Sequence, residues 1–154
     1  MGAALTQHPD AYGAVVARVG IYDMLRVERT PNGQFNVTEY GSVKDPGQRE
    51  ALRAYSPYHN VEDGERYPPV LFTSGANDPR VDPFHSRKMV ARLQEATGKK
   101  GLVLLRESGE TGHGMGTPLS TRIEEEVDAY SFLFDELGVK YRPVTGQVPA
   151  PPAK

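Results

Sequence analysis

The chain has 154 residues, enough for one domain with a hydrophobic core. Its 18 basic and 20 acidic residues give a net charge of −2, so no basic surface indicates nucleic acid as a partner. No apolar run is long enough to cross a bilayer, and no secretory signal is recognisable. The absence of cysteine excludes disulfides and thiol catalysis. We therefore expect a cytoplasmic protein, with a periplasmic location as the alternative, and neither nucleic acid nor a membrane as partner.

The first residues predict the second half of a helix. MGAALTQHP consists of helix formers up to Pro9, which ends the helix, but nothing caps its start. A helix that begins without a cap indicates that residues in front of it have been removed; a short natural N-terminal helix is the alternative. The apolar, largely β-branched run at 14–22 then predicts a strand buried on both faces.

The middle of the chain predicts a second strand between two helices. A long irregular segment rich in turn residues follows residue 22 and leads into a short helix over 46–55. The apolar run at 68–75 predicts a second buried strand. A helix is expected over 83–97 with Gly98 as its stop. Its apolar stripe consists of Phe84, Met89, Val90 and Leu93.

The last third of the chain predicts a strand, a glycine-rich loop and the longest helix. The run at 101–107 reads as a third buried strand, and the helix is expected over 119–138. The apolar side of this helix consists of Ile123, Val127, Tyr130, Phe134 and Leu137. A disordered Pro/Ala-rich tail at 144–154 is expected to lie outside the domain formed by residues 1–143.

Buried strands that alternate with helices predict an α/β fold with a parallel sheet. Ligands of such sheets bind beyond the carboxyl ends of the strands. Asp78 follows the second predicted strand and His113 follows the third, so both residues are expected at the same sheet edge. An aspartate that accepts the Nδ1 proton of a histidine fixes the imidazole tautomer and leaves Nε2 free as a base.

Each of these residues also has a simpler interpretation. His113 in a glycine-rich loop could be an exposed residue without a role, and Asp78 before a proline could only stabilise a turn. A metal site formed by Asp78, Asp82 and His85 is a further alternative. Asp82, which precedes Pro83, is more simply explained as a helix N-cap.

Four segments together resemble the C-terminal half of the hydrolase domain of the prolyl oligopeptidase family. They are QHPDAYGAVVARVGIYDML at 7–25, YSPYHNV at 55–61, the strand and NDPRVDPFHSRKMVARLQ within 70–94, and ETGHGMGTP at 110–118. The resemblance extends over about residues 1–143. It implies a partial α/β-hydrolase fold, three-layered with a mostly parallel sheet, of which this chain carries the last three strands.

The resemblance also assigns roles to single residues. It implies that Asp78 is the acid and His113 the base of a catalytic triad in a serine peptidase without a cofactor. Asp78 precedes His113, in agreement with the order of α/β-hydrolases. Arg80 corresponds to the family arginine that binds a substrate carbonyl. Asn36 stands where prolyl-specific members stack a tryptophan on the substrate proline, and the neighbouring Phe35 is either a substitute ring or a packing residue.

No serine of the chain lies in a Gly-x-Ser-x-Gly sequence, the pattern of the nucleophile turn in this class of enzyme. We therefore expect the chain to begin several residues after its nucleophile and to be inactive alone, with a peptide as substrate of the parent protein. Two alternatives remain open: a small flavodoxin-like ligand-binding module and a non-catalytic interaction subunit. A strand edge without its usual neighbour predicts self-association.

Overall fold

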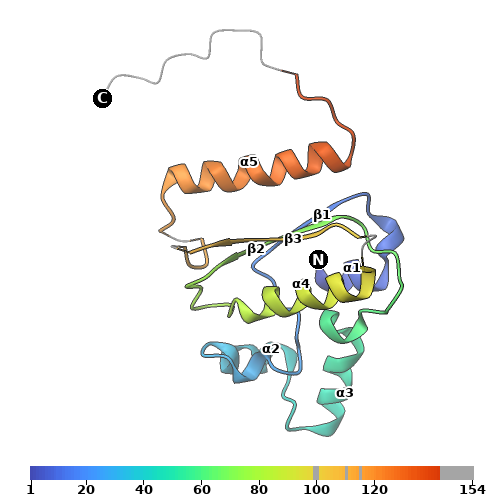
Figure 1. Ribbon diagram of the computed structural model, residues 1–154. Helices are drawn as coiled ribbons and strands as arrows, with labels where there is room; N and C mark the ends of the chain where they lie inside the picture. Colours follow the sequence, from blue (N-terminus) through green and yellow to red (C-terminus); the bar gives the residue numbers. More distant parts are fainter. Residues whose placement is uncertain (99–100, 110, 115, 143–154) are drawn as a thin grey trace.

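The computed structural model describes residues 1–98, 101–109, 111–114 and 116–142, so the predicted tail at 144–154 lies outside the described residues. Its centre is a parallel sheet with the strand order β1-β2-β3 (Figure 1). The strands are β1 (Val15–Arg18), β2 (Val70–Gly75) and β3 (Val103–Ser108). The three strands are in register along the sheet, with Val70 aligned with Val15 on one side and with Val103 on the other.

Helices cover both faces of this sheet and give the molecule three layers. Helices α1 (Gly2–Gln7) and α4 (Phe84–Thr97) lie on one face, and α5 (Leu119–Glu136) lies on the other (Figure 1). This arrangement confirms the predicted α/β class. Gly98 follows α4 with a φ of 57° and a ψ of −139°, a backbone conformation that residues with a Cβ atom rarely adopt, so a glycine ends the helix here.

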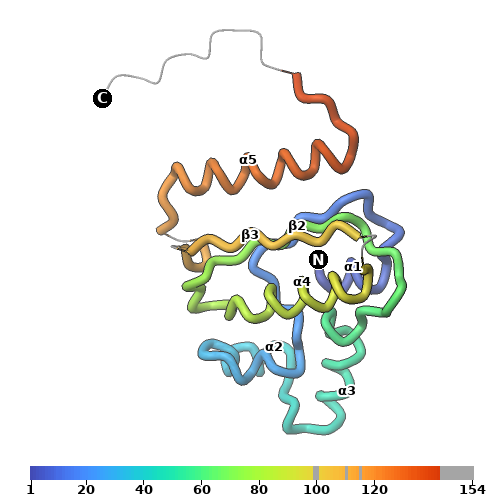
Figure 2. Tube along the Cα trace, viewed as in Figure 1, coloured from blue at the N-terminus to red at the C-terminus, as the bar shows by residue number. Residues whose placement is uncertain are grey.

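The chain between β1 and β2 extends away from the sheet (Figures 1 and 2). It contains the helices α2 (Val37–Tyr40) and α3 (Pro46–Tyr55). Asp45 caps α3, because its Oδ1 accepts a hydrogen bond of 2.8 Å from the backbone N–H of Gln48. Short 3-10 helices in the described part of the chain include η1 (Pro9–Ala11), η2 (Val27–Arg29), η3 (Gly33–Asn36) and η4 (Pro57–Asn60).

The main core lies between the sheet and the layer that contains α4. Phe72 of β2 and Met89 and Leu93 of α4 are completely buried, as the apolar stripe of the predicted helix requires. Full burial of one such side chain stabilises the fold by about 1.5–3 kcal/mol. A second, smaller core of Met24, Val27 and Leu52 holds α3 against the segment that follows β1.

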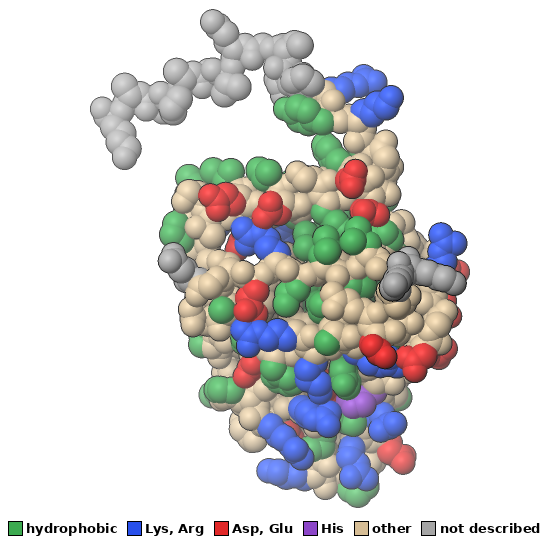
Figure 3. All heavy atoms as spheres, in the orientation of Figure 1, with side chains coloured by type: hydrophobic (Ala, Val, Ile, Leu, Met, Phe, Trp, Pro, Cys, Tyr) green, Lys and Arg blue, Asp and Glu red, His purple; other side chains and the backbone are tan. Residues whose placement is uncertain are grey.

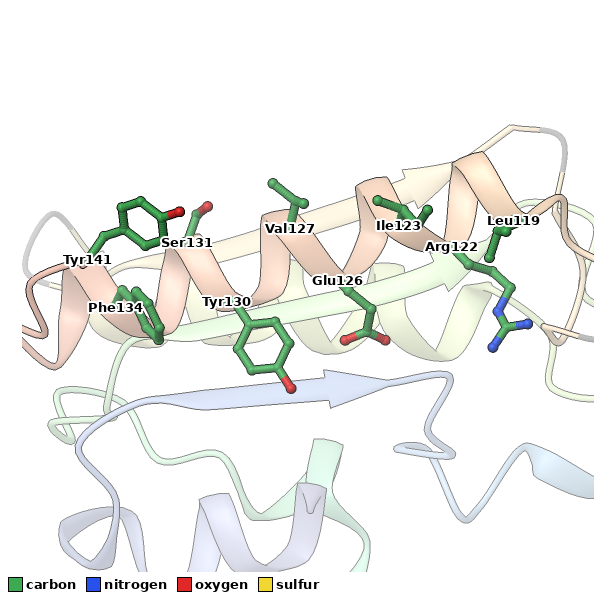
Figure 4. A pocket seen from close by; sticks show the side chains of 9 residues that line it. All are labelled: Leu119, Arg122, Ile123, Glu126, Val127, Tyr130, Ser131, Phe134 and Tyr141. Atoms are coloured by element: carbon green, nitrogen blue, oxygen red, sulfur yellow. The ribbon is translucent and has the colours of Figure 1, made fainter. Parts of the chain in front are cut away.

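The opposite face of the sheet differs from the prediction. The apolar side of the predicted last helix does not pack on the strands, since Ile123, Val127 and Tyr130 are 54%, 56% and 57% exposed. Only Ala129 and Phe132 of α5 are buried. The exposed side chains line a groove of about 650 Å³ along α5, which Figure 4 shows from close by. The apolar side of α5 is therefore a surface and not part of the core.

Ion pairs fasten α5 to the strands beneath it. Arg18 at the end of β1 forms two hydrogen bonds, of 2.6 and 2.9 Å, with the carboxylate of Glu126. Arg106 of β3 contacts Asp128 at 2.5 Å and Glu125 at 3.2 Å. All of these groups are at least partly exposed, so each pair contributes on the order of 1 kcal/mol or less.

The expectation that the first and third strands are buried on both faces is wrong. Residues of β1 alternate between buried and partly exposed, and Leu104 of β3 remains 41% exposed. The reason is their position, because in the part of the chain that the structure describes β1 and β3 are edge strands and only β2 has a neighbour on each side. In β2 all residues except the half-buried Thr73 are buried.

Candidate active site

The turn after β2 holds the carboxylate of Asp78 rigidly. Its Oδ1 accepts hydrogen bonds from the backbone N–H groups of Arg80 (2.8 Å) and Val81 (2.9 Å), the pattern of an Asx turn. The side chain is completely buried. Asp78 therefore stabilises its own turn, as the simpler interpretation holds, but Oδ2 remains available for a second partner.

That partner is His113, on the loop after β3. Its Nδ1 lies 2.7 Å from Oδ2 of Asp78, and the imidazole is 30% exposed. A carboxylate only accepts hydrogen bonds, so this contact assigns the proton to Nδ1 and leaves Nε2 as a lone-pair acceptor. Within the described residues Nε2 forms no hydrogen bond. The pair can therefore accept a proton from a hydroxyl group that reaches Nε2.

Close contact between two loops sets this geometry. The backbone N–H of Asn77 donates to the carbonyl of Thr111 at 3.2 Å, and its side-chain amide donates to the carbonyl of Gly109 at 2.8 Å. At Gly75 a Cβ atom would lie only 2.3 Å from the carbonyl oxygen of Gly112. Only glycine at this position allows the end of β2 to approach the His113 loop so closely.

A cavity of about 390 Å³ opens beside His113. Arg80 and Val81 line it from the Asp78 turn, and Met1 lines it from the N-terminal end of α1. Val19, just after β1, completes the wall and has a φ of 42°, which a β-branched residue rarely adopts. Its N–H is nevertheless held at 2.9 Å by the carbonyl of Thr73. The position of Val19 was not predictable, since nothing in a β-branched run indicates a left-handed residue.

The other predicted substrate-binding residues lie in different positions. The side chain of Arg80 is exposed at the rim of the cavity. Phe35 is 76% exposed, so the interpretation of Phe35 as a packing residue is wrong. Asn36 is half-buried at the start of α2. Neither Phe35 nor Asn36 lines the cavity that contains His113.

The alternative metal site does not form. Within the described residues no group of three or more histidine, aspartate or glutamate side chains is placed to hold a metal ion. Oδ1 of Asp82 accepts the N–H of Phe84 at 2.9 Å at the start of α4. Nδ1 of His85 accepts the N–H of Asp23 at 3.1 Å. Asp82 therefore holds the first turn of α4, and His85 ties α4 to the segment after β1.

A buried ionic cluster near the cavity was not among the predicted features. The completely buried carboxylate of Asp23 pairs with Lys88 of α4 and, at 2.9 Å, with Arg26. Burial opposes ionisation of Asp23, but hydrogen bonds from Lys88 and Arg26 outweigh it and lower the pKa of this carboxyl. The signal in the sequence was an acidic residue enclosed in the apolar run IYDML.

None of the seven serines supplies a hydroxyl to His113. Ser74 at the end of β2 lines a small cavity of about 170 Å³ beside His113 but forms no hydrogen bond with it. Ser56 is completely buried and lies 2.9 Å from Nδ1 of His59, a second Ser–His contact. That contact ties η4 to the segment after β1, because Ser56 Oγ also accepts the N–H of Met24 at 3.1 Å.

Comparison with known proteins identifies this fold. The sequence profile of the prolyl oligopeptidase family matches residues 1–140. The chain belongs to the prolyl oligopeptidase family. Family members with similar sequences include the prolyl endopeptidase of Dictyostelium discoideum, 39% identical over 143 residues, and that of Elizabethkingia miricola, 36% identical over 141 residues. The match covers 91% of this chain in both cases, but only 19% and 20% of the relatives.

Solved structures of the family agree with the fold described above. A structure from a study of two prolyl endopeptidases matches 90% of this chain with a TM-score of 0.87 and 44% identity. Oligopeptidase B from Leishmania major matches 92% with a TM-score of 0.86 and 26% identity. Each match covers 20% of the solved chain. The three strands and their helices are therefore part of an α/β-hydrolase catalytic domain, as the resemblance implied.

Proposed function

We propose that this chain is the acid–base portion of a serine peptidase of the prolyl oligopeptidase family, with Asp78 as the acid and His113 as the base. The observation that carries the proposal is the 2.7 Å contact between Asp78 Oδ2 and His113 Nδ1 at the rim of a cavity. In this arrangement Nε2 takes the proton of the attacking hydroxyl, and Asp78 stabilises the imidazolium that forms.

The nucleophile is proposed to come from outside residues 1–154. No serine of the chain has the required Gly-x-Ser-x-Gly sequence, and none bonds to His113. Met1, Gly2 and Ala3 line the same cavity as His113. A segment placed ahead of Met1 and continuous with α1 would therefore enter the cavity that the imidazole faces.

The substrate is proposed to be a peptide. Its carbonyl oxygen would accept hydrogen bonds from the exposed guanidinium of Arg80 at the rim of the cavity. Phe35 and Asn36 do not line this cavity. They are therefore proposed to contact parts of the peptide that lie outside it.

The test compares this chain with an extended chain that carries a Gly-x-Ser-x-Gly-Gly segment continuous with α1. We expect a fluorescent organophosphonate to label the extended chain and not the 154-residue chain, because only the former has an activated hydroxyl. Asp78→Asn in the extended chain should lower the rate of peptide ester hydrolysis by a factor on the order of 10⁴, because the imidazole loses the partner that fixes its tautomer.

Two results would contradict the proposal. Labelling of the 154-residue chain would place a nucleophile within it. Equal hydrolysis rates for the extended chain and its His113→Ala variant would remove His113 from the mechanism. Lys44→Gln, an exposed change distant in sequence from both loops, serves as the control that should leave the rate unchanged.

A further inference from the structure

Basic side chains gather around a second cavity, on the part of the molecule that carries α3. Its volume is about 310 Å³. The lining residues are Arg26, Arg29, Arg49, Arg53 and His59, with Leu25 and Val43 as apolar members. Lys and Arg side chains are concentrated over this end of the molecule in Figure 3. The cavity shares no lining residue with the one beside His113.

Two separate elements supply the four guanidinium groups. Arg49 and Arg53 lie one turn apart on the same face of α3. Arg26 directly precedes η2 and Arg29 is its last residue, and the small core of Met24, Val27 and Leu52 holds η2 against α3. The positions of the four groups are therefore set by packing of the backbone elements that carry them.

The positive charge of this cavity is largely uncompensated. Arg26 pairs with Asp23 at 2.9 Å, but Arg29, Arg49 and Arg53 form no ion pair with any carboxylate in the described part of the chain. Like charges four residues apart on a helix destabilise it, so Arg49 and Arg53 repel each other across one turn. A bound anion would remove this repulsion.

The pKa of His59 is sensitive to the positive charge of this cavity. Burial chiefly lowers its pKa; Arg26, Arg53 and Lys88 lower it further, and Asp23 raises it. The imidazole is 16% exposed at the wall of the cavity. An anion bound beside it would favour its protonated form and raise its pKa.

We propose that this cavity binds a small molecule with two or more phosphate groups. The planar fork of a guanidinium matches two phosphate oxygens at once, and arginine is the residue most suited to such contacts. Three uncompensated arginines call for more than one negative charge. The apolar side chains of Leu25 and Val43 offer a surface to the uncharged part of the ligand.

Titration calorimetry of the 154-residue chain with sodium tripolyphosphate tests the proposal. We expect saturable binding of one molecule per chain that weakens with rising salt. Arg49→Gln with Arg53→Gln should lower the affinity about tenfold or more, the factor that corresponds to one charge-assisted hydrogen bond. The matched control is Arg66→Gln with Arg122→Gln, which removes the same charge from exposed positions outside the cavity and should retain the affinity.

Three outcomes would overturn the proposal: no saturable binding, an equal loss of affinity in the two double variants, or citrate binding as tightly as tripolyphosphate. Thermal unfolding without ligand checks that the Arg49/Arg53 variant folds; if it does not, Arg29→Gln takes its place.

As a second measurement, NMR titration of His59 should show a higher pKa with tripolyphosphate than without it. An unchanged pKa would contradict binding in this cavity.

Discussion

His85 lies between α4 and the segment after β1, where it is only 1% exposed. Its Nδ1 faces the backbone N–H groups of Tyr22 and Asp23 at 3.4 and 3.1 Å, so this nitrogen must remain unprotonated to accept them. Burial lowers the pKa of His85 from 6.5 to about 4; Lys88 also lowers it, while Asp23 and Asp82 oppose the shift. The imidazole is thus a neutral structural acceptor.

This burial makes stability depend on pH. The unfolded chain binds a proton at His85 below pH 6.5, whereas the folded chain does so only near pH 4. The contribution of His85 is therefore complete above pH 6.5 and is lost as the pH falls through about 4. The loss amounts to about 3 kcal/mol over this range.

Denaturant unfolding at a series of pH values measures this effect. In His85→Gln an amide oxygen replaces the Nδ1 acceptor but does not titrate, so we expect a flatter dependence of the unfolding free energy on pH between 6.5 and 4. The slopes are compared and not the absolute stabilities, because the substitution also alters packing. Identical slopes for the two proteins would contradict the neutral state of His85.

At the scale of elements, the contact between the end of β2 and the loop after β3 decides where His113 lies. A methyl group at Gly75 would lie 2.3 Å from the carbonyl oxygen of Gly112 and 2.4 Å from that of Thr111. Both are backbone atoms that cannot rotate away. Any larger side chain at Gly75 must move one loop relative to the other.

We therefore expect Gly75→Ala to destabilise the fold by about 1–3 kcal/mol, the usual cost of overpacking, and to separate His113 from Asp78. The measurement is the NMR signal of the hydrogen-bonded Nδ1 proton of His113, which should weaken or shift. Gly109→Ala is the control, because no atom lies within 4 Å of a Cβ at that position. An unchanged Nδ1 signal in Gly75→Ala would show that the loops do not depend on this contact.

At the scale of the whole molecule, two unpartnered surfaces lie next to each other. Strand β1 has a neighbour only in β2, so its other edge is free within the described residues. Helix α5 reaches β1 through the pair between Glu126 and Arg18, and carries the apolar groove on its exposed side. Free strand edges and apolar patches of this kind promote association.

We propose that a second copy of the chain covers these surfaces, since the free edge of one β1 can pair with that of another around a two-fold axis. Sedimentation velocity at micromolar concentration should show dimers or larger species. Ile123→Glu with Val127→Glu should shift the distribution toward monomer without loss of stability, because both side chains are more than half exposed. Lys44→Gln with Arg66→Gln, which changes the net charge equally, should leave it unaltered. A monomer that the Glu variants do not change would contradict the proposal.

The order of elements and their class were predictable because strands and helices differ in periodicity. Helix α3 matches the predicted 46–55, and α4 begins one residue after the predicted start. The exposure of the apolar side of α5 was not predictable, because an apolar stripe in a sequence does not indicate which surface the helix packs against. The φ of Val19 and the burial of Asp23 depend on tertiary contacts, which a single sequence does not display. The approach of Asp78 to His113 followed from topology, since parallel neighbouring strands end at one edge.

Two different stretches of the chain build the candidate active site. The turns after β2 and β3 carry Asp78 and His113, whereas Ile21, Met24 and Tyr55, which also line the cavity, come from the excursion between β1 and β2. Substitution of the incompletely buried excursion residues that line the cavity therefore removes no group of the Asp78–His113 contact. In the proposed peptidase, selectivity can therefore change separately from proton transfer, and new selectivities should be sought by randomising the incompletely buried cavity residues Ile21, Tyr40 and Tyr55 while 75–81 and 109–114 stay fixed.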